Sequence, residues 1–237
     1  MAESDLFTNI KTVYSRMARA AMKAERDLTR IRLVAVTKQV PAAMVCAAVD
    51  CGLREFGESR VQVAEQKIPV IRAGTVGADL IWHLIGPLQK NKSKKAVGLF
   101  DLIHSVDSVG LASAINGHAS NIGKVQRVLL EVKLSGEESK HGLDGDSVIG
   151  FLEAVQGFKN LEVEGLMTVP PFSEDPQETR PYFKKLREIR DMARASGFRL
   201  RELSMGMSHD FEVAIEEGAT IVRVGTALFG ERKKEAA

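Results

Sequence analysis

The sequence predicts a single (β/α)8 barrel that follows an N-terminal leader helix. Eight short runs of apolar and β-branched residues alternate with stretches of helical spacing along the chain. Strict alternation of this kind indicates a parallel sheet covered by helices. The first run, 32–38 (RLVAVTK), is apolar through its middle, as expected for a strand buried on both faces. Eight units in about 200 residues fit a closed barrel better than an open doubly wound sheet.

Length and composition indicate a globular protein. The 237 residues are 44% hydrophobic and 27% charged, which is enough to bury a core and too apolar for a disordered chain. No linker-like stretch interrupts them, so we expect one domain over 1–237, with the leader helix within 1–30 and the barrel over 31–232. No apolar run approaches the roughly 20 residues of a membrane span. The charged N-terminus is unlike a signal peptide.

The predicted elements follow one another in a regular order. Residues 3–28 have apolar positions at helical spacing and predict the leader helix. A helix over 42–52 is expected to end at Gly52, because glycine commonly terminates helices. Later helices are clearest over 177–196 and 208–217, with Ser208 as the expected N-cap of the second. The other seven strands are predicted at 53–57, 80–86, 99–106, 125–134, 161–169, 200–205 and 220–225.

The balance of charge argues against nucleic acid or an anionic membrane as a partner. Cysteine usage argues against stabilising disulfide bonds. The chain has 33 basic and 31 acidic residues, a formal net charge of +2, which is too balanced for a strong attraction to polyanions. Residues 89–95 (QKNKSKK) are locally basic, but the lack of aromatic neighbours favours the solvated first turn of a helix over a phosphate-binding patch. Cys46 and Cys51, five residues apart on one predicted helix, are expected to be small core residues. We therefore expect a reduced, cytoplasmic protein.

A barrel of this type carries its chemistry at the C-terminal ends of its strands. Lys38 ends the first predicted strand, so its amine is expected at the barrel mouth. Burial lowers the pKa of a lysine, and the neutral amine can attack an aldehyde to form a Schiff base. The alternative is a lysine that extends from the strand end into solvent.

Two glycine-containing turns at the last two strands predict a phosphate site. The segment 204–210 (SMGMSHD) contains Ser204 and Gly206 before a predicted helix, and 223–230 (RVGTALFG) contains Gly225 and Thr226. Glycines let backbone N–H groups approach an anion, and hydroxyls and helix N-termini add donors. Such a pair of turns lies where these barrels often bind phosphate.

A phosphate site opposite a Schiff-base lysine fits pyridoxal 5′-phosphate, or a sugar phosphate in an imine-forming aldolase. Arg223 helps to separate the two, because it lies two residues before Gly225 and shares its side of the strand. A guanidinium donates hydrogen bonds and keeps its proton, so a pyridine nitrogen that faces it stays unprotonated. Such a cofactor is a poor electron sink. The alternative for Arg223 is an ion pair at the barrel rim.

Several motifs together resemble the YggS/PROSC family of pyridoxal phosphate homeostasis proteins, from about residue 30 to residue 232. The motifs are VAVTKQVP, FGESRVQ, WHLIGPLQKNK, HSVDS, ESKHG, EGLMTVP and LSMGMSHDFEVAIEEGATIVRVGTALFGER. The resemblance implies an alanine-racemase-like barrel that binds pyridoxal phosphate covalently through Lys38, with Arg223 facing the pyridine nitrogen. It also implies that the phosphate is held by Ser204, Gly206, Gly225 and Thr226, with Met205 beside it. Two departures are Ser59, where members usually have asparagine, and Lys133, where many have asparagine.

The sequence favours a carrier over an enzyme. A racemase needs a second base, and the tyrosine that serves in related racemases comes from a domain that this chain does not have. Tyr14 and Tyr182 fall in helical stretches, and His83 and His104 are expected to be packed, hydrogen-bonded histidines. A metal site of these histidines with Asp107 lacks ligand spacing. The resemblance implies vitamin B6 and amino/keto acid homeostasis with apo-enzymes as recipients, and the alternatives are a weak racemase or an aldolase.

Overall fold

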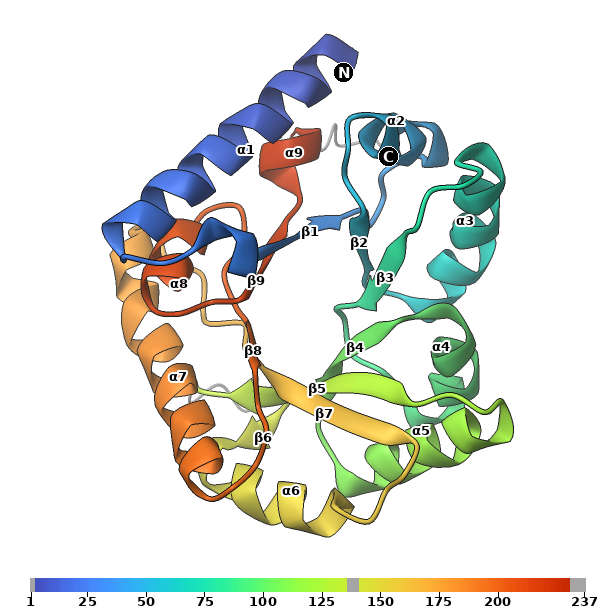
Figure 1. The fold of residues 1–237 in the computed structure, drawn as a ribbon, viewed down its shortest axis with the longest axis vertical. Coiled ribbons are helices and arrows are strands. Elements are labelled where there is room, and N and C mark those ends of the chain that lie inside the picture. The colour runs from blue at the N-terminus through green and yellow to red at the C-terminus, as the bar shows by residue number, and fades with distance from the viewer. Residues whose placement is uncertain (1–2, 136–140, 231–237) are drawn as a thin grey trace, which may run out of the picture.

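Eight parallel strands close into a barrel in the computed structural model, which describes residues 3–135 and 141–230 (Figure 1). The last strand pairs with the first, with Arg223 opposite Val34, and this pairing closes the ring. A two-residue strand β6 (Leu143–Asp144) adds to the end of β5 outside the ring. The predicted (β/α)8 barrel is therefore confirmed. Its strands are β1 (Arg32–Val36), β2 (Glu55–Glu58), β3 (Ile81–Leu84), β4 (Leu102–Val106), β5 (Gln126–Lys133), β7 (Leu161–Met167), β8 (Glu202–Ser204) and β9 (Ile221–Val224).

Helices surround the strands, and the leader helix precedes the first strand as predicted. Short 3-10 turns occupy Leu28–Arg30, Lys90–Lys92, Gly145–Ser147 and Pro176–Thr179. The helices are α1 (Glu3–Lys23), α2 (Ala42–Asp50), α3 (Val61–Gly74), α4 (Ser93–Leu99), α5 (Val109–Asn121), α6 (Val148–Val155), α7 (Arg180–Ala195), α8 (Phe211–Glu216) and α9 (Thr226–Phe229).

Three predicted helix boundaries are corrected by local backbone geometry. The leader helix ends at Lys23, not residue 28, because Glu25 adopts a left-handed φ of 52° and Asp27 then caps a 3-10 turn. The helix predicted over 177–196 begins at Arg180, after the 3-10 turn Pro176–Thr179. The helix predicted over 208–217 begins at Phe211 with Asp210 as its N-cap, so Ser208 is not that cap.

The strands separate two apolar cores, because successive side chains point to opposite faces. Inside the barrel a small cluster consists of Val34, Leu102, Leu129, Met167 and Ile221, all essentially inaccessible to solvent. Between strands and helices lies the larger core, where the rings of Phe56 and Trp82 are 5.4 Å apart. Cys46 and Cys51 are free and half-buried, and they pack against the edge of this outer core rather than inside it, so the prediction of core positions holds only in part.

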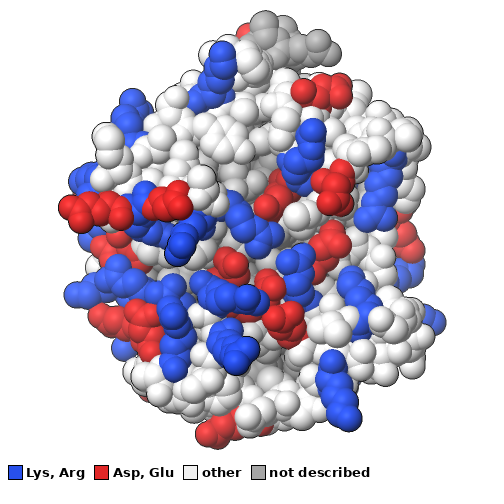
Figure 2. Space-filling view, in the orientation of Figure 1, with Lys and Arg blue, Asp and Glu red and all other residues white. Residues whose placement is uncertain are grey.

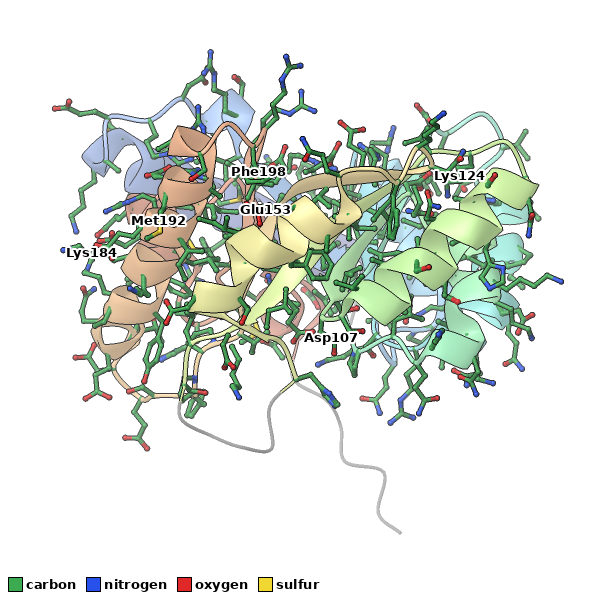
Figure 3. All side chains as sticks on the ribbon, turned by 90° about the horizontal axis from the view of Figure 1, so that it is seen from below. Asp107, Lys124, Glu153, Lys184, Met192 and Phe198 are labelled. Carbon is green, nitrogen blue, oxygen red and sulfur yellow. The ribbon has the colours of Figure 1, made fainter. Side chains whose placement is uncertain are left out.

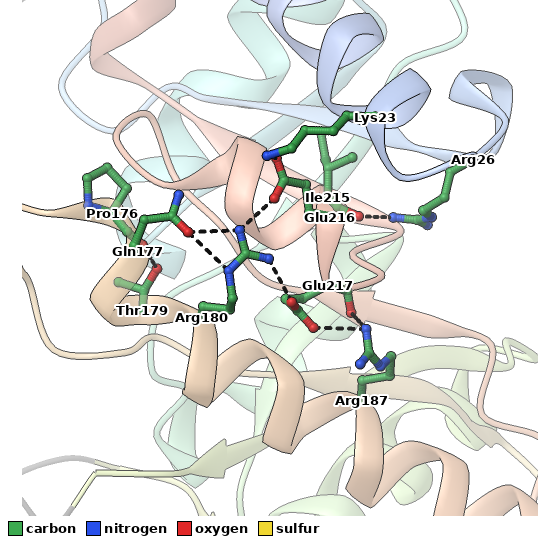
Figure 4. Close-up of polar contacts among 10 residues, drawn as sticks. All are labelled: Lys23, Arg26, Pro176, Gln177, Thr179, Arg180, Arg187, Ile215, Glu216 and Glu217. Carbon is green, nitrogen blue, oxygen red and sulfur yellow. Dashed lines mark hydrogen bonds and ion pairs between the residues drawn. The ribbon is translucent and has the colours of Figure 1, made fainter.

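Charged contacts join α8, which directly precedes β9, to α1 and α7 (Figure 4). Glu216 pairs with Lys23 and Arg180, and Glu217 pairs with Arg180 at 2.7 Å and Arg187 at 2.9 Å. The Asn9 side chain also donates to the carbonyl of Leu228 at 3.0 Å and ties the leader helix to α9. The leader helix thus contacts both α8 and α9, the two short helices that follow the predicted phosphate-site turns.

One face of the molecule carries charges of both signs. On the face seen in Figure 2, Lys and Arg are interspersed with Asp and Glu. The basic segment 89–95 forms the 3-10 turn and exposed first turn of α4, as predicted. Within residues 3–135 and 141–230, no helix combines the length and the apolar character needed to cross a membrane.

Candidate functional site

Three of the predicted site residues meet at the C-terminal ends of β1 and β9. Lys38, Gly225 and Thr226 line one cavity of about 180 Å³, together with Val36, Gln39, Val40, Pro41, Met44, Phe229 and Gly230. Figure 3 shows the two ends of the barrel, with Asp107 after β4 near one edge and Lys124 and Phe198, which precede β5 and β8, near the other. The cavity therefore belongs to the barrel end where catalytic and binding residues of this fold gather.

Lys38 lies in a tight turn that follows β1. The strand ends at Val36, two residues earlier than predicted, and the Val40 N–H donates to the Thr37 carbonyl at 2.9 Å. Gln39 completes the turn in the left-handed region with φ 63°. The turn carries the Lys38 side chain to an exposed position, so the desolvation expected from the sequence is not present. Lys38 instead lines the edge of the cavity.

A buried polar cluster anchors this turn from below. The Thr37 hydroxyl donates to Glu58 Oε1 at 2.7 Å, and Lys67 Nζ donates to the same oxygen at 2.8 Å and to the Thr37 carbonyl at 2.6 Å. Glu58 is only 1% exposed, so these contacts are sheltered from water. Lys67 is committed to this cluster, and Lys133, one of the two departures, pairs with Asp144 at 3.5 Å. Lys38 is thus the lysine that shares the cavity with the phosphate-site turn.

Ser208 marks the position of an acceptor at the start of α9. Its Oγ accepts hydrogen bonds from the backbone N–H of Gly225 at 3.2 Å and of Ala227 at 3.3 Å. Two amides that converge on one oxygen, at a turn that opens a short helix, are a donor set suited to a phosphate oxygen. Sequence reasoning assigned Ser208 to the wrong helix, since a cap for α9 across 17 residues has no local signature.

The other residues of the predicted phosphate turn serve the layer beneath. The Ser204 side chain points into the barrel, where its Oγ accepts from Arg223 Nη1 at 2.6 Å. Met205 points the opposite way into the outer core, and its N–H donates to the Ile221 carbonyl. Gly206 has φ +90°, and a Cβ there would lie 2.5 Å from the Ala214 Cβ. None of these three residues is among those that line the cavity, and their contacts with a phosphate stay a prediction.

Arg223 is a buried cation held by neutral partners. Nη1 donates to Ser204 and Nη2 donates to the Thr168 carbonyl at 3.0 Å, while the residue is 3% exposed. Burial lowers the pKa of Arg223 to about 10 against the opposing effect of Asp210 and Glu131, so the side chain keeps its charge at neutral pH. It makes no ion pair with any residue in the described part of the chain, which argues against the rim ion pair as its role.

Both histidines are packed and hydrogen-bonded, as predicted. His83 and His104 are completely buried, with His83 Nδ1 2.9 Å from His104 Nε2. The described residues contain no group of three ligating side chains placed to hold a metal ion. Tyr14 and Tyr182 lie on the outer helices α1 and α7, as their patterns indicated.

Glu131 is a titratable residue near the mouth that the sequence reasoning missed. Burial, followed by repulsion from Asp107, raises the pKa of Glu131 to about 7, while Arg223 acts in the opposite direction. No sequence motif distinguishes it from other glutamates in strands. The other departure, Ser59, lines a separate cavity with Pro87, Gln89 and Lys92. Part of the ESKHG motif, residues 138–140, and the last two residues of the motif ending at 232 lie outside the described residues.

Comparison with known proteins decides the family. Residues 9–233 match the family model described as alanine racemase, N-terminal domain. A pyridoxal phosphate homeostasis protein of Aquifex aeolicus is 45% identical over 225 residues, which cover 94% of this chain and 97% of that protein. The pyridoxal phosphate homeostasis protein of Pseudomonas aeruginosa is 40% identical, and the match covers 97% of this chain and 96% of that protein. The chain belongs to the pyridoxal phosphate homeostasis protein family.

Solved structures agree with this membership and with the resemblance seen in the sequence. PipY of Synechococcus elongatus, whose structure has pyridoxal phosphate bound, is 38% identical with a TM-score of 0.79 over 92% of this chain and 100% of that chain. An unknown protein from Bifidobacterium adolescentis is 39% identical with a TM-score of 0.89, over 96% of this chain and 95% of that chain. Alanine racemase of Clostridium difficile is 14% identical with a TM-score of 0.72, over 98% of this chain and 61% of the racemase, so it shares the fold alone.

Proposed function

We propose that this protein binds pyridoxal 5′-phosphate, holds it as a Schiff base on Lys38 and acts as its carrier or buffer in the cytoplasm. In this role it serves vitamin B6 and amino/keto acid homeostasis and passes the cofactor to apo-enzymes. The observation that carries the proposal is the shared cavity of Lys38, Gly225 and Thr226. Close relatives named for pyridoxal phosphate homeostasis, and a related structure with the cofactor bound, support it.

The residues at this end of the barrel fit the chemistry of the group. When bound, pyridoxal phosphate supplies an aldehyde, a pyridine nitrogen and a phosphate dianion. Lys38 supplies a primary amine at the cavity, and the amides of Gly225 and Ala227 already converge on a serine oxygen. Thr226 adds an exposed hydroxyl at the same turn. Arg223 supplies a cation that only donates hydrogen bonds, so a ring nitrogen facing it stays unprotonated.

The remaining predicted residues support these groups. Ser204 holds Arg223, and Gly206 lets α8 approach the turn that carries Ser208. The backbone N–H of Met205, directly after β8, donates a hydrogen bond to the carbonyl of Ile221 in β9 and so connects these two strands. We infer that Lys38, Arg223, Gly225 and Thr226 face the cofactor, with Ser204, Met205 and Gly206 shaping the site around them.

A weak racemase is the second candidate, and Glu131 is the observation that favours it. A carboxyl with a pKa of about 7 exchanges its proton at neutral pH, as a general base must. Against this reading, both tyrosines lie on outer helices, so neither matches the tyrosine base of the related racemases. If the protein turned over any amino acid well above the rate of free pyridoxal phosphate, the racemase would be established and the carrier role would be rejected.

The decisive experiment compares Lys38→Ala with Lys133→Ala. The purified proteins are titrated with pyridoxal phosphate, reduced with borohydride and mapped by peptide mass spectrometry. We expect the parent and Lys133→Ala to be labelled at residue 38 and Lys38→Ala to show no imine band, with unchanged thermal unfolding because the Lys38 side chain is exposed. Labelling of another lysine in Lys38→Ala would reject residue 38 as the attachment site. Transfer of bound cofactor to an apo-enzyme, compared with free cofactor at equal concentration, then tests the carrier role.

A further inference from the structure

Among the described residues, a file of polar side chains crosses the barrel interior beside the apolar cluster of Val34, Leu102, Leu129, Met167 and Ile221. It runs from Arg223 near the C-terminal mouth to Glu55 at the first position of β2. Arg223 Nη1 lies 2.6 Å from Ser204 Oγ, which lies 2.9 Å from His104 Nδ1. The file continues from His104 Nε2 to His83 Nδ1 over 2.9 Å. It ends in an ion-pair contact of 3.1 Å between His83 Nε2 and Glu55 Oε2, whose geometry falls short of a well-formed hydrogen bond. Ser204 and both histidines are completely buried, so water does not compete for these contacts.

The hydrogen-bonding capacities of these groups determine where each proton lies. Arg223 only donates, so Ser204 accepts from it and its own O–H is available for His104 Nδ1. His104 then carries its proton on Nε2 and donates to His83 Nδ1. His83 in turn carries its proton on Nε2, which faces the Glu55 carboxylate. Every proton in this arrangement points from the C-terminal mouth toward Glu55.

The reverse order is disfavoured at one contact. If His104 donated from Nδ1 to Ser204, then His83 would donate from Nδ1 and present an unprotonated Nε2 to a carboxylate oxygen 3.1 Å away. Two acceptors would then face each other in a buried site, which is costly. A doubly protonated histidine is also disfavoured, because burial lowers the pKa of both His83 and His104.

Glu55 is fixed as the anionic end of the file. Burial raises the pKa of Glu55, but the contact with His83 and the hydrogen bonds from Arg32 outweigh it and lower the pKa overall. Arg32 Nε lies 3.0 Å from both carboxylate oxygens. A cation at one end and a carboxylate at the other align the dipoles between them, and hydrogen bonds in such a chain strengthen one another.

We propose that His104, His83 and Glu55 are positioning residues for Arg223, because their directed hydrogen bonds aim the Ser204 lone pair at the guanidinium. The inference rests on the proposed function, in which Arg223 faces the bound ring. It extends the cofactor site through the barrel to residues at the opposite end. Removal of the charge at Glu55 is therefore expected to change how Ser204 holds the Arg223 guanidinium, although Glu55 and Arg223 share no direct contact.

The test compares Glu55→Gln with the matched control Glu164→Gln. Glu164 is a buried carboxylate on β7, paired with Arg127 at 3.8 Å and outside the file. A glutamine at 55 can donate as well as accept, so the proton direction is no longer enforced. Histidine tautomers are read by ¹H–¹⁵N NMR of the full-length protein without added cofactor. Pyridoxal phosphate affinity and the absorption band of the bound cofactor are read by titration.

We expect neutral Nε2–H tautomers for His83 and His104 in the parent and in Glu164→Gln, and mixed tautomers in Glu55→Gln. Cofactor affinity should fall by between about twofold and thirtyfold in Glu55→Gln alone, with a shifted absorption band. An imidazolium or an Nδ1–H tautomer at His104 in the parent would overturn the inference, as would unchanged affinity and band in Glu55→Gln. A parent with the expected tautomers that binds no pyridoxal phosphate would instead reject the proposed function and leave the proton order intact.

Discussion

Gly206 is expected to be required for packing of α8, which makes Gly206→Ala a test of how the phosphate-site turns are built. Its φ of +90° lies in the left-handed region, where a non-glycine residue costs about 1–2 kcal/mol. A Cβ would lie 2.5 Å from the Ala214 Cβ and 2.9 Å from the Phe211 Cα, and overpacking of this kind costs about 1–3 kcal/mol. Together the two effects predict a loss of about 2–5 kcal/mol in the free energy of unfolding.

Two further glycines separate these contributions. Gly52 has φ +96° with no atom within 4 Å of the position that a Cβ would occupy, so Gly52→Ala should show the backbone cost alone, about 1–2 kcal/mol. Gly117 lies exposed in α5 with free space around it, so Gly117→Ala should stabilise the protein by about 0.5–1 kcal/mol. Urea unfolding of the four proteins, followed by circular dichroism, gives the free energies.

The difference in the free energy of unfolding between Gly206→Ala and Gly52→Ala isolates the cost of the contact with α8. If the two variants lost the same stability, α8 would not press against residue 206, and the packing argument would be refuted. A larger loss in Gly206→Ala, with a similar dependence on urea concentration, would confirm that glycine is needed there to let α8 approach.

Three other predictions concern single groups near the mouth. Thr226→Val should weaken pyridoxal phosphate binding by about 10- to 100-fold, because one hydrogen bond to a charged group is lost, and it should leave pyridoxal binding almost unchanged. If titrations showed an equal loss of affinity for both ligands, Thr226 would lie away from the phosphate. Ser208→Ala removes the acceptor for two amides and should lower the free energy of unfolding by about 1 kcal/mol, as for loss of a helix cap, while the exposed Ser120→Ala stays within about 0.5 kcal/mol of the parent. Because the pKa of Glu131 is about 7 in the fold and 4.5 without it, the unfolded chain ionises first and parent stability should fall by at most about 3 kcal/mol as pH rises from 4.5 to 7. Glu131→Gln should lose that part of the pH dependence in urea unfolding, and an identical dependence in both proteins would mean that Glu131 is not buried as described.

The architecture and the first contacts of the site follow from patterns that are local in the sequence. Apolar β-branched runs at regular intervals predict the eight strands, and parallel strands bring their C-terminal ends to one side. That rule alone is enough to expect Lys38, Gly225 and Thr226 at the same end of the barrel, where they share a cavity. Helix boundaries were less predictable, since a left-handed residue such as Glu25 has no strong sequence signal.

Only the tertiary structure decided how the polar residues pair. The sequence predicts that Ser208 caps the helix that follows it, but closure of the barrel brings its side chain to the amides of Gly225 and Ala227 instead. The file from Arg223 to Glu55 joins five strands that are distant in sequence, and it depends on strand register, because a shift of one residue would turn His83 or His104 to the other face. Sequence determines which side chains alternate inward along each strand, whereas closure of the ring determines which of them meet.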